Sequence, residues 1–452
     1  MNLTRFSAIS LIALAFLAPS WAAAETTAQA TAGLRSSSLA DVQQDSLSAS
    51  HRIIYIDGRP SSIGQAHLDS VQHLINEFYY DQFRHFSDPD APYFLFMSKD
   101  AQLAMGIGGC VRARGWYDWG GAVPANGFAP YLIPMDSDPA NMRKFGTSPS
   151  GTALFFRVIG RNKALGNYQL YIEANFNGYG GRGFHLKKAY ATVNDWTIGY
   201  AQTTFSDPAA ESPTVDAQGA NNKLSGTSVL VRWMHTMRSR WTVAASLETP
   251  SSQPGVQDGL TEKVSDWLPD VAAFVQYAWG RSEHVRLSGI MRTLGYRDLR
   301  EGRNHNVIGW GAQLSTVSHP LPQVTLYGTV CGGKGFESMC GDLQMGNYDL
   351  VPVPGRDSEL YAPYALGWSV GLQYNFLPNL FASATYSESR YMPRRGAAAE
   401  EYKLGRYMAA NIFWNITPRI QTGVEYDWGQ RRNMDGRHRH AQRVGVLAQF
   451  SF

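Results

Sequence analysis

Arg443-Val-Gly-Val-Leu-Ala-Gln-Phe-Ser-Phe452 ends the chain with a period of two residues. Because successive side chains on a β-strand point to opposite faces, one face here is apolar and the other is mostly polar or small. Residues 168–176, 369–376 and 420–428 repeat the pattern. Such runs approach ten residues, whereas strands of soluble sheets usually have about 5–6. About ten is the length of a tilted strand that crosses a bilayer.

Working back from the C-terminus, the same pattern predicts about sixteen strands joined by alternating short and long connections. We place them near residues 101–114, 152–161, 167–177, 184–193, 196–205, 227–236, 241–249, 271–279, 283–296, 305–317, 324–331, 366–376, 380–390, 402–415, 420–430 and 438–452. Hydrocarbon tolerates no unpaired sheet edge, so the sheet must close. The sequence therefore predicts an all-β fold: an antiparallel, about 16-stranded transmembrane β-barrel of the porin type over residues 95–452.

Bulky aromatics give independent support, because rings of this kind gather at membrane interfaces. They border the predicted short turns, and they are Trp196, Trp241, Trp279, Phe376, Trp414 and Phe452. The composition agrees, since only 17% of residues are charged and 44% are hydrophobic. The mean hydropathy of −0.27 excludes an α-helical membrane protein.

The N-terminus predicts export. Arg5, an apolar run at 8–19 and small residues at 22–24 form a signal peptide over residues 1–24. With a barrel, this predicts the bacterial outer membrane. Residues 25–94 are expected to be a short periplasmic segment with a linker, a possible strand and one amphipathic helix near 65–86. That helix could form a small domain, help chains associate, or pack on its own barrel. The segment is too small for the folded plug of a bulky-ligand transporter.

If the apolar face meets lipid, the opposite parity lines the lumen. Acids outnumber bases before residue 95, and the reverse holds after it. Within the barrel region, the inner parity places an excess of basic residues in the lumen. An enclosed pore with fixed positive charge concentrates anions, and Arg grips carboxylates with two donors. The predicted pore-lining residues are Arg112, Arg114, Arg157, Arg161, Lys188, Arg232, Arg286, Arg292 and Arg443, with Cys110 and Lys403 on the same parity. Glu173, Glu248, Glu425 and Asp427 oppose them.

Two further features concern the loops. The segment FSDPAAESPTVDAQGANNKLSG (205–226) follows the fifth strand, and we expect it to fold inward and narrow the pore. Its acids, Asp207, Glu211 and Asp216, would then face the basic wall across an eyelet. Cys331 and Cys340 share a Gly-rich stretch of an exported chain, so we predict a disulfide between them, with two free thiols as the alternative.

The stretch GFHLKKAYATVNDWTIGYAQTTFSDPAAESPTVDAQGANN (183–222) resembles the hallmark of the DcaP-like trimeric outer-membrane porins. MGIGGCVRARG (105–115) resembles the first barrel strand of that family. The resemblance covers about residues 95–452 and is most specific at 204–216. It implies sixteen strands, a homotrimer in outer-membrane lipid, and uptake of small anionic solutes such as dicarboxylates. The family's better-known members carry a periplasmic coiled coil, whereas residues 51–90 here hold one short helix.

The sequence therefore favours a passive porin for small anions. A neutral-solute or sugar porin is the nearest alternative, although Phe155, Tyr171, Tyr327 and Phe413 give only a sparse aromatic ladder. A structural, adhesive or lipase-like barrel is the other alternative. No clustered Ser, His and acid predicts catalysis, so we expect no enzyme, no catalytic residue, no cofactor, no metal site and no nucleic-acid partner.

Overall fold

The computed structural model describes residues 52–57, 71, 74–76, 78, 81–89, 92–136, 138–176, 183–280 and 282–452. The predicted signal peptide and linker lie outside the described residues. Within the described ranges, no helix combines the length and apolarity needed to cross a membrane.

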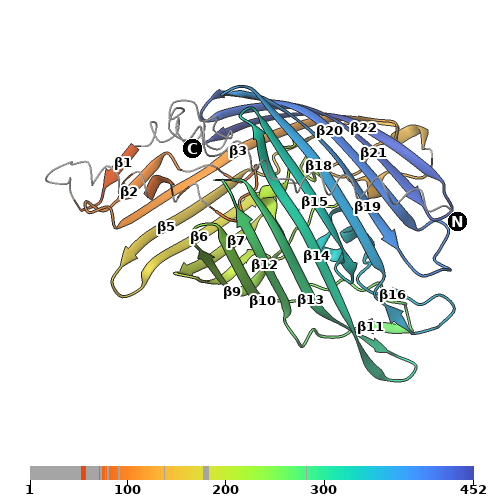
Figure 1. The fold of residues 1–452 in the computed structure, drawn as a ribbon. Helices are drawn as coiled ribbons and strands as arrows, with labels where there is room; N and C mark the ends of the chain where they lie inside the picture. The colour runs from red at the N-terminus through yellow and green to blue at the C-terminus, as the bar shows by residue number, and fades with distance from the viewer. Residues whose placement is uncertain are drawn as a thin grey trace. The chain divides into compact units, whose positions relative to one another are not determined.

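The wall is a closed antiparallel barrel of 16 strands (Figure 1). Its strands are β3 (Leu103–Trp119), β5 (Ala153–Asn162), β6 (Gly166–Phe176), β7 (Phe184–Val193), β8 (Trp196–Gln202), β9 (Thr227–Met237), β10 (Trp241–Glu248), β12 (Asp270–Ala278), β13 (His284–Asp298), β14 (Arg303–Leu321), β15 (Val324–Lys334), β18 (Tyr364–Leu377), β19 (Leu380–Met392), β20 (Tyr402–Thr417), β21 (Ile420–Asn433) and β22 (His438–Ser451). The last strand pairs with the first, with Gln449 opposite Arg112. The predicted fold class is confirmed, and most strand boundaries fall within a few residues of the prediction.

Short elements lie in the long connections between the wall strands. They are β4 (Arg143–Ser148), β11 (Thr261–Lys263), β16 (Val351–Pro352), β17 (Leu360–Tyr361) and the 3₁₀ turns η2 (Pro130–Leu132), η3 (Pro139–Asn141), η5 (Pro208–Ala210), η6 (Glu337–Met339) and η7 (Gly341–Gly346). β4 pairs with β3 beyond the end of β5, and β11 pairs with β13 beyond the end of β12. These pairings cover the strand edges that unequal strand lengths would otherwise leave open.

The opposite end of the barrel has tight turns. Between β9 and β10, Arg238 and Ser239 have φ angles of 49° and 56°. Two consecutive left-handed residues match the twist of a hairpin. Beside these turns, Trp196, Trp241, Trp279, Phe376 and Trp414 are 43–54% exposed on the outer surface. These are five of the six residues of the predicted aromatic girdle, and the sixth, Phe452, is only partly exposed.

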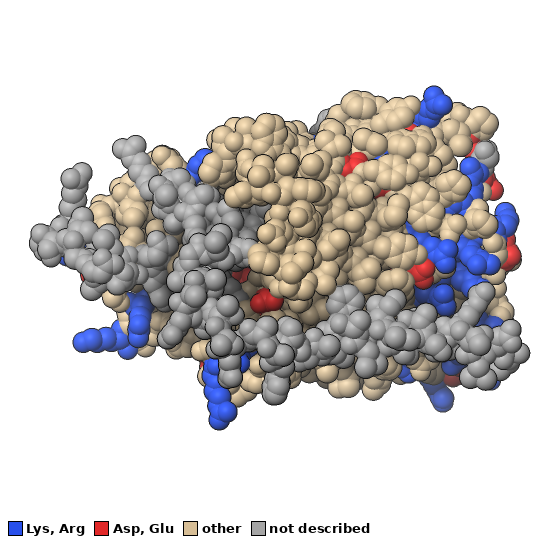
Figure 2. All heavy atoms as spheres, turned by 45° about the horizontal axis from the view of Figure 1, so that its top comes forward, with Lys and Arg blue, Asp and Glu red and all other residues tan. Residues whose placement is uncertain are grey.

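The outer surface is apolar where a bilayer would contact it. On β22, Val444, Val446 and Phe450 are 37%, 48% and 46% exposed, whereas Leu447 is 6% exposed on the inner face. Figure 2 shows one side of the molecule, where the middle is almost free of charge and Lys and Arg gather toward the long-loop end. A soluble monomer rarely exposes so large an apolar surface. The barrel is therefore of the membrane-spanning kind.

Two N-terminal strands complete the short-turn end. β22 ends at Ser451 opposite Cys110, and β2 (Phe94–Met97) then takes its place beside residues 104–106 of β3. β1 (Arg52–Tyr55) pairs with β2 in parallel. The N-terminal region is thus joined to the wall by backbone hydrogen bonds.

The amphipathic helix packs on its own barrel. Its described residues, Val71, Leu74, Ile75, Asn76 and Phe78, are helical. The four apolar ones are buried in a cluster that includes Ala104 of β3 and Ile159 of β5. Both wall residues lie on the inner face, where alternate neighbours are buried. Of the three placements that the sequence left open, the structure shows the one in which the helix packs on its own barrel.

Candidate pore constriction

Basic side chains line the inner wall on four different strands. Arg112, Arg157, Arg232 and Arg286 stand on β3, β5, β9 and β13, and none is more than 6% exposed. Their neighbours on the other face contact the outside, as the 56% exposure of Val111 shows. The structure places these predicted residues inside, on several sides of one lumen.

A β-bulge brings a second lysine to this set. Glu173 of β6 pairs with Lys188 of β7, but Ala174 pairs with Leu186, so Lys187 is the extra residue. Lys187 Nζ lies 2.9 Å from Glu173 Oε1 and 2.7 Å from Asp88 Oδ1. Lys188 Nζ lies 3.2 Å from Asp88 Oδ2. Strict alternation predicted only Lys188, because a bulge leaves no signature in the period.

The loop between β8 and β9 crosses the lumen. The backbone N–H groups of Val215 and Asp216 donate to Glu425, at 2.9 and 2.5 Å. Near the start of the loop, the Thr204 N–H donates to Glu248 at 2.8 Å. The wall acids thus hold the loop by its backbone.

Glycine lets this loop lie flat against the wall. A Cβ at Gly371 of β18 would lie 2.6 Å from the Ser212 Cβ, and one at Gly367 would lie 2.6 Å from the Asn222 Cβ. Both distances are shorter than real Cβ contacts. Any side chain at either position would push the loop inward.

The acids of the loop contact basic groups directly. Asp207 accepts from Ser315 at 2.6 Å and lies 2.9 Å from His284 and 3.3 Å from Arg286. Burial works to raise the pKa of Asp207, but Arg286 and His284 outweigh it and hold that pKa well below its ordinary value.

The other two loop acids are also paired. Glu211 lies 2.7 Å from Lys223 and 3.0 Å from His85. Asp216 accepts from the Phe128 N–H at 2.8 Å and lies 3.8 Å from Arg443. We expected the loop acids to face the basic wall across an open eyelet, and that geometry is wrong. Charges that touch neutralise each other locally instead of creating a field across a gap.

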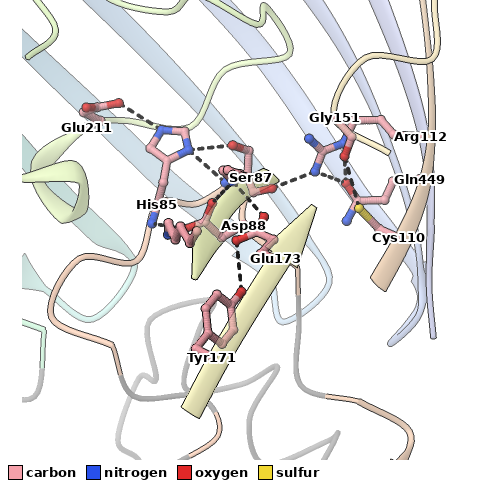
Figure 3. A network of polar contacts seen from close by, with 12 residues as sticks. His85, Ser87, Asp88, Cys110, Arg112, Gly151, Tyr171, Glu173, Glu211 and Gln449 are labelled. Atoms are coloured by element: carbon pink, nitrogen blue, oxygen red, sulfur yellow. Dashed lines mark hydrogen bonds and ion pairs between the residues drawn. The ribbon is translucent and has the colours of Figure 1, made fainter. Parts of the chain in front are cut away.

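Residues 81–89 also lie inside the barrel, against the basic wall. The Ser87 carbonyl accepts from Arg112 at 2.8 Å, and the Gln82 carbonyl accepts from Arg286 at 3.2 Å. Figure 3 shows Asp88 beside Glu173 and the Ser87–Arg112 contact. Just before this segment, the Phe78 carbonyl accepts from Arg157 at 2.6 Å.

Two aromatic rings anchor the segment on different parts of the wall. The Arg232 guanidinium lies 4.0 Å from the centroid of the Phe83 ring, which also contacts Phe274 of β12 at 6.1 Å. The Phe86 ring contacts Phe381 of β19 and Phe413 of β20, at 5.9 and 5.2 Å. The sequence predicts a periplasmic position for this segment, and its small size argues against a folded plug. It needs no fold of its own, because the wall supplies its partners.

His85 joins the segment to the loop. Its Nδ1 accepts from the Ser87 N–H at 3.1 Å, so this nitrogen carries no proton. The proton is therefore on Nε2, which lies 3.0 Å from Glu211 Oε2. Burial lowers the pKa of His85, and Lys223 lowers it further. The ring is neutral where it meets the loop.

The empty space inside the barrel is divided at the contact between His85 and Glu211. A cavity of about 490 Å³ opens on the short-turn side, where Arg240, Glu283 and Pro418 are among its lining residues. A second cavity of about 30 Å³ lies between the segment and the loop, near Arg114 and Tyr327. Both cavities are lined by His85 and Glu211, so the contact between the segment and the loop lies between them.

The remaining predicted residues fall into three groups. Arg292 pairs with Asp270 of β12 and with Asp349 of a long loop, at 3.0 and 3.3 Å. Arg443 pairs with Asp118 of β3 at 2.6 Å and donates to the Asn126 carbonyl at 3.0 Å, so both arginines join a loop to the wall. Inside the barrel, Arg114 donates to the carbonyls of Val215 and Ser150, Glu425 and Asp427 are buried, and Cys110 is buried against the Gly151 carbonyl.

Arg161 and Lys403 are exposed. Arg161 belongs to the inner parity but lies at the short-turn end of β5. Lys403 follows Tyr402 at a register irregularity between β20 and β21, so its predicted place in the lumen is wrong. Alternation therefore predicts the position of a side chain correctly only where the strand register is regular and the strand lies within the barrel wall.

The predicted disulfide is also absent. Cys331 and Cys340 are free and buried, and their sulfur atoms lie 3.6 and 3.8 Å from the Asn222 carbonyl oxygen. Asn222 belongs to the loop that crosses the lumen, and its carbonyl oxygen is the hydrogen-bond partner of both thiols. The alternative of two free thiols is the one the structure has.

Comparisons with known proteins identify solved structures that have a similar fold. No protein-family model and no curated protein matches the sequence. Among solved structures, the outer membrane channel DcaP of Acinetobacter baumannii is similar with a TM-score of 0.66 and 19% identity, covering 79% of this chain and 99% of that chain. An anion-selective porin from Comamonas acidovorans has a TM-score of 0.52 and 10% identity, over 77% of this chain and 100% of that chain. OmpT expressed in the outer membrane of Vibrio cholerae has a TM-score of 0.50 and 11% identity, over 78% and 98%.

The chain thus has the fold of the outer-membrane porins, as the barrel and its inward loop already indicated. Within that class, it has the fold of the DcaP channel, which is what the resemblance of residues 183–222 implied.

Proposed function

We propose that this protein is a passive outer-membrane porin that prefers small anions, dicarboxylates among them. The supporting observation is the buried basic wall around the constriction, formed by Arg112, Arg157, Arg232, Arg286 and the lysine pair. Fixed positive charge in a narrow pore with low-dielectric walls attracts anions and repels cations. Two structural neighbours, an outer membrane channel and an anion-selective porin, agree with this proposal.

We further propose that the functional unit is a homotrimer in outer-membrane lipid. The family resemblance supports this, and the apolar outer surface can serve both lipid and a neighbouring barrel. Native mass spectrometry of the detergent-purified protein tests it. A single peak at the monomer mass under gentle conditions would contradict the trimer.

The decisive measurement is the reversal potential across a planar bilayer under a KCl gradient. Reversal potential reports selectivity and does not depend on the fraction of time that the pore is open. We expect chloride selectivity that declines when Arg112 or Arg157 becomes Gln. Arg300→Gln is the matched control, because Arg300 is 60% exposed in the loop after β13 and pairs with the exposed Asp357. A cation-selective or unselective wild-type pore would overturn the proposal, and the unselective outcome would favour a neutral-solute porin.

A further inference from the structure

The segment of residues 81–89 stands where a permeating solute must pass. It contacts β3 through Ser87, β12 through Phe83 and β19 and β20 through Phe86. These strands belong to different sides of the barrel. The cavity on the loop side, of about 30 Å³, is much smaller than the one of about 490 Å³ on the short-turn side.

The groups that the segment offers to the wall are those of an anion. Arg112, Arg157 and Arg286 receive backbone carbonyl oxygens, and the lysine pair receives the Asp88 carboxylate. Carbonyl and carboxylate oxygens are also what a small dicarboxylate offers to guanidinium and ammonium groups. The segment and the solute would therefore compete for the same donors.

The Asp88 site is the most specific of these contacts. One carboxylate oxygen lies 2.7 Å from Lys187 Nζ and the other lies 3.2 Å from Lys188 Nζ. The lysine pair, His85 and burial all act on this group, and the cations hold the pKa of Asp88 well below its ordinary value against the opposing effect of burial. Each lysine is positioned by the wall, Lys187 by Glu173 and Lys188 by its place in the ladder. Lys187 would keep Glu173 as a partner if Asp88 left, and the backbone ladder fixes Lys188 at the same position of the wall.

The segment has an exit route. The cavity of about 490 Å³ adjoins it on the short-turn side and is lined by Asp81, Gln82, Arg84 and Phe86 of the segment itself. Two aromatic rings, polar contacts to wall cations and the His85–Glu211 contact are among the interactions that hold it. Water and dissolved anions can replace such polar contacts, so release leaves few buried groups without partners.

We propose that residues 81–89 are a displaceable plug, and that Asp88 occupies a carboxylate-binding subsite formed by Lys187 and Lys188. A small dicarboxylate binds this subsite in place of Asp88 and thereby favours the open pore. This inference rests on the proposed function for the identity of the solute, but the plug itself does not depend on anion selectivity. The ligand shifts the equilibrium because it binds the plug-free state and not the plugged one.

The test uses tryptic cleavage after Arg84, followed by mass spectrometry on the full-length protein in detergent micelles. A protease needs an extended stretch of accessible backbone, so the plugged state resists cleavage. We expect Asp88→Asn to accelerate cleavage by about tenfold, because hydrogen bonds to charged groups contribute on the order of that factor. Succinate should accelerate cleavage of the wild type, whereas neutral succinamide at the same concentration should not.

Three further variants sharpen the test. Lys187→Gln and Lys188→Gln should remove the response to succinate, because they destroy the subsite. Asp357→Asn removes an ion pair with Arg300 on an exposed loop and should leave cleavage after Arg84 unchanged. Single-channel recording adds a second readout, in which Asp88→Asn raises the open fraction.

The outcomes separate the plug from the proposed function. Cleavage after Arg84 that is insensitive to both Asp88→Asn and succinate would overturn the plug. Accelerated cleavage in a pore without anion selectivity would support the plug and reject the anion porin. Faster cleavage with Asp88→Asn but no response to succinate would support the plug and reject the carboxylate subsite.

Discussion

Two stretches fill the lumen. Both place acceptors beside basic groups of the wall, as Asp207 and the Val215 carbonyl do in the loop after β8, but the loop binds wall acids as well. The loop after β8 gives backbone N–H groups to wall acids, of which Glu425 is 1% exposed and Glu248 is 3% exposed. The segment of residues 81–89 gives carbonyl oxygens and Asp88 to wall cations. Removal of the loop would strand buried carboxylates with no donor. Removal of the segment would leave cations that water and anions can solvate. The loop is therefore a fixed part of the pore, and the segment is the exchangeable one.

The largest effect is expected at the loop anchor. Glu425→Ala removes the acceptor of Val215 N–H, Asp216 N–H and Asn411 Nδ2. A buried group left without a partner costs about 1–3 kcal/mol, so the loss of several should lower the free energy of unfolding by roughly 3 kcal/mol or more. The temperature at which the barrel loses its folded mobility on an SDS gel measures this. Glu301→Gln, at an exposed loop acid, is the control.

The same variant should also widen the pore, since the loop loses its hold on β21. A higher single-channel conductance together with a lower unfolding temperature is the expected pair of results. Unchanged stability would mean that the loop is no more fixed than the segment, and the comparison would fail.

At the aromatic anchor of the segment we expect an effect on docking of the segment and a smaller one on the unfolding of the barrel. Phe83 is 5% exposed, and truncation of a buried Phe to Ala typically costs about 3–5 kcal/mol. Because the cost falls on docking of the segment, Phe83→Ala should raise the open fraction and cleavage after Arg84 while leaving the unfolding temperature of the barrel nearly unchanged. Phe145→Ala, at a ring that is 72% exposed, is the control. A large drop in unfolding temperature without a change in conductance would show that the segment is a structural brace.

Acidification should open the pore to a more modest extent. Burial and Lys223 lower the pKa of His85 in the plugged state, so the released segment takes up a proton more readily. As pH falls below the ordinary value of about 6.5, the free energy of protonation therefore favours release. The pKa values of Asp88 and Glu211 are also lowered, and their protonation at still lower pH acts in the same direction.

The open fraction measured from pH 7.5 to 5 tests this sign. His85→Gln should flatten the rise, because an amide does not titrate in this range. A pore that closes on acidification would contradict the neutral ring inferred from the Ser87 N–H bond.

The fold could be predicted from the sequence because it depends on short-range alternation. The predicted strand 184–193 matches β7 (Phe184–Val193), and the inner parity correctly placed Arg112 and Arg286. The failures have physical causes. Bulges shift the face of a residue without changing composition, which is why Lys187 was missed and Lys403 was misplaced.

The contents of the lumen could be predicted only in part. The contacts of Asp207 with His284 and of Asp216 with Arg443 join residues far apart in the chain, and no local pattern encodes them. The plug is harder still, because carbonyl oxygens from Gln82 and Ser87 make much of its contact with the wall. Backbone acceptors exist at every residue and therefore leave no trace in a sequence. The one feature of the local sequence that indicates the plug is the negative charge of Asp88, which precedes a barrel with an excess of basic residues.

The smallest expected effect compares two arginines on the inner parity of β5. Arg157 is 6% exposed and donates to the Phe78 carbonyl, whereas Arg161 is exposed at the short-turn end. Salt screens exposed charges over about 10 Å at 0.1 M and about 3 Å at 1 M, but it screens buried ones much less. Arg161→Gln should therefore reduce chloride selectivity slightly in dilute KCl and not at all near 1 M. Arg157→Gln should reduce selectivity at both concentrations. If both variants reduced selectivity equally in dilute KCl and not at all near 1 M, the lumen at Arg157 would be as accessible to water and salt as the rim. The segment would then be undocked from that site for most of the time.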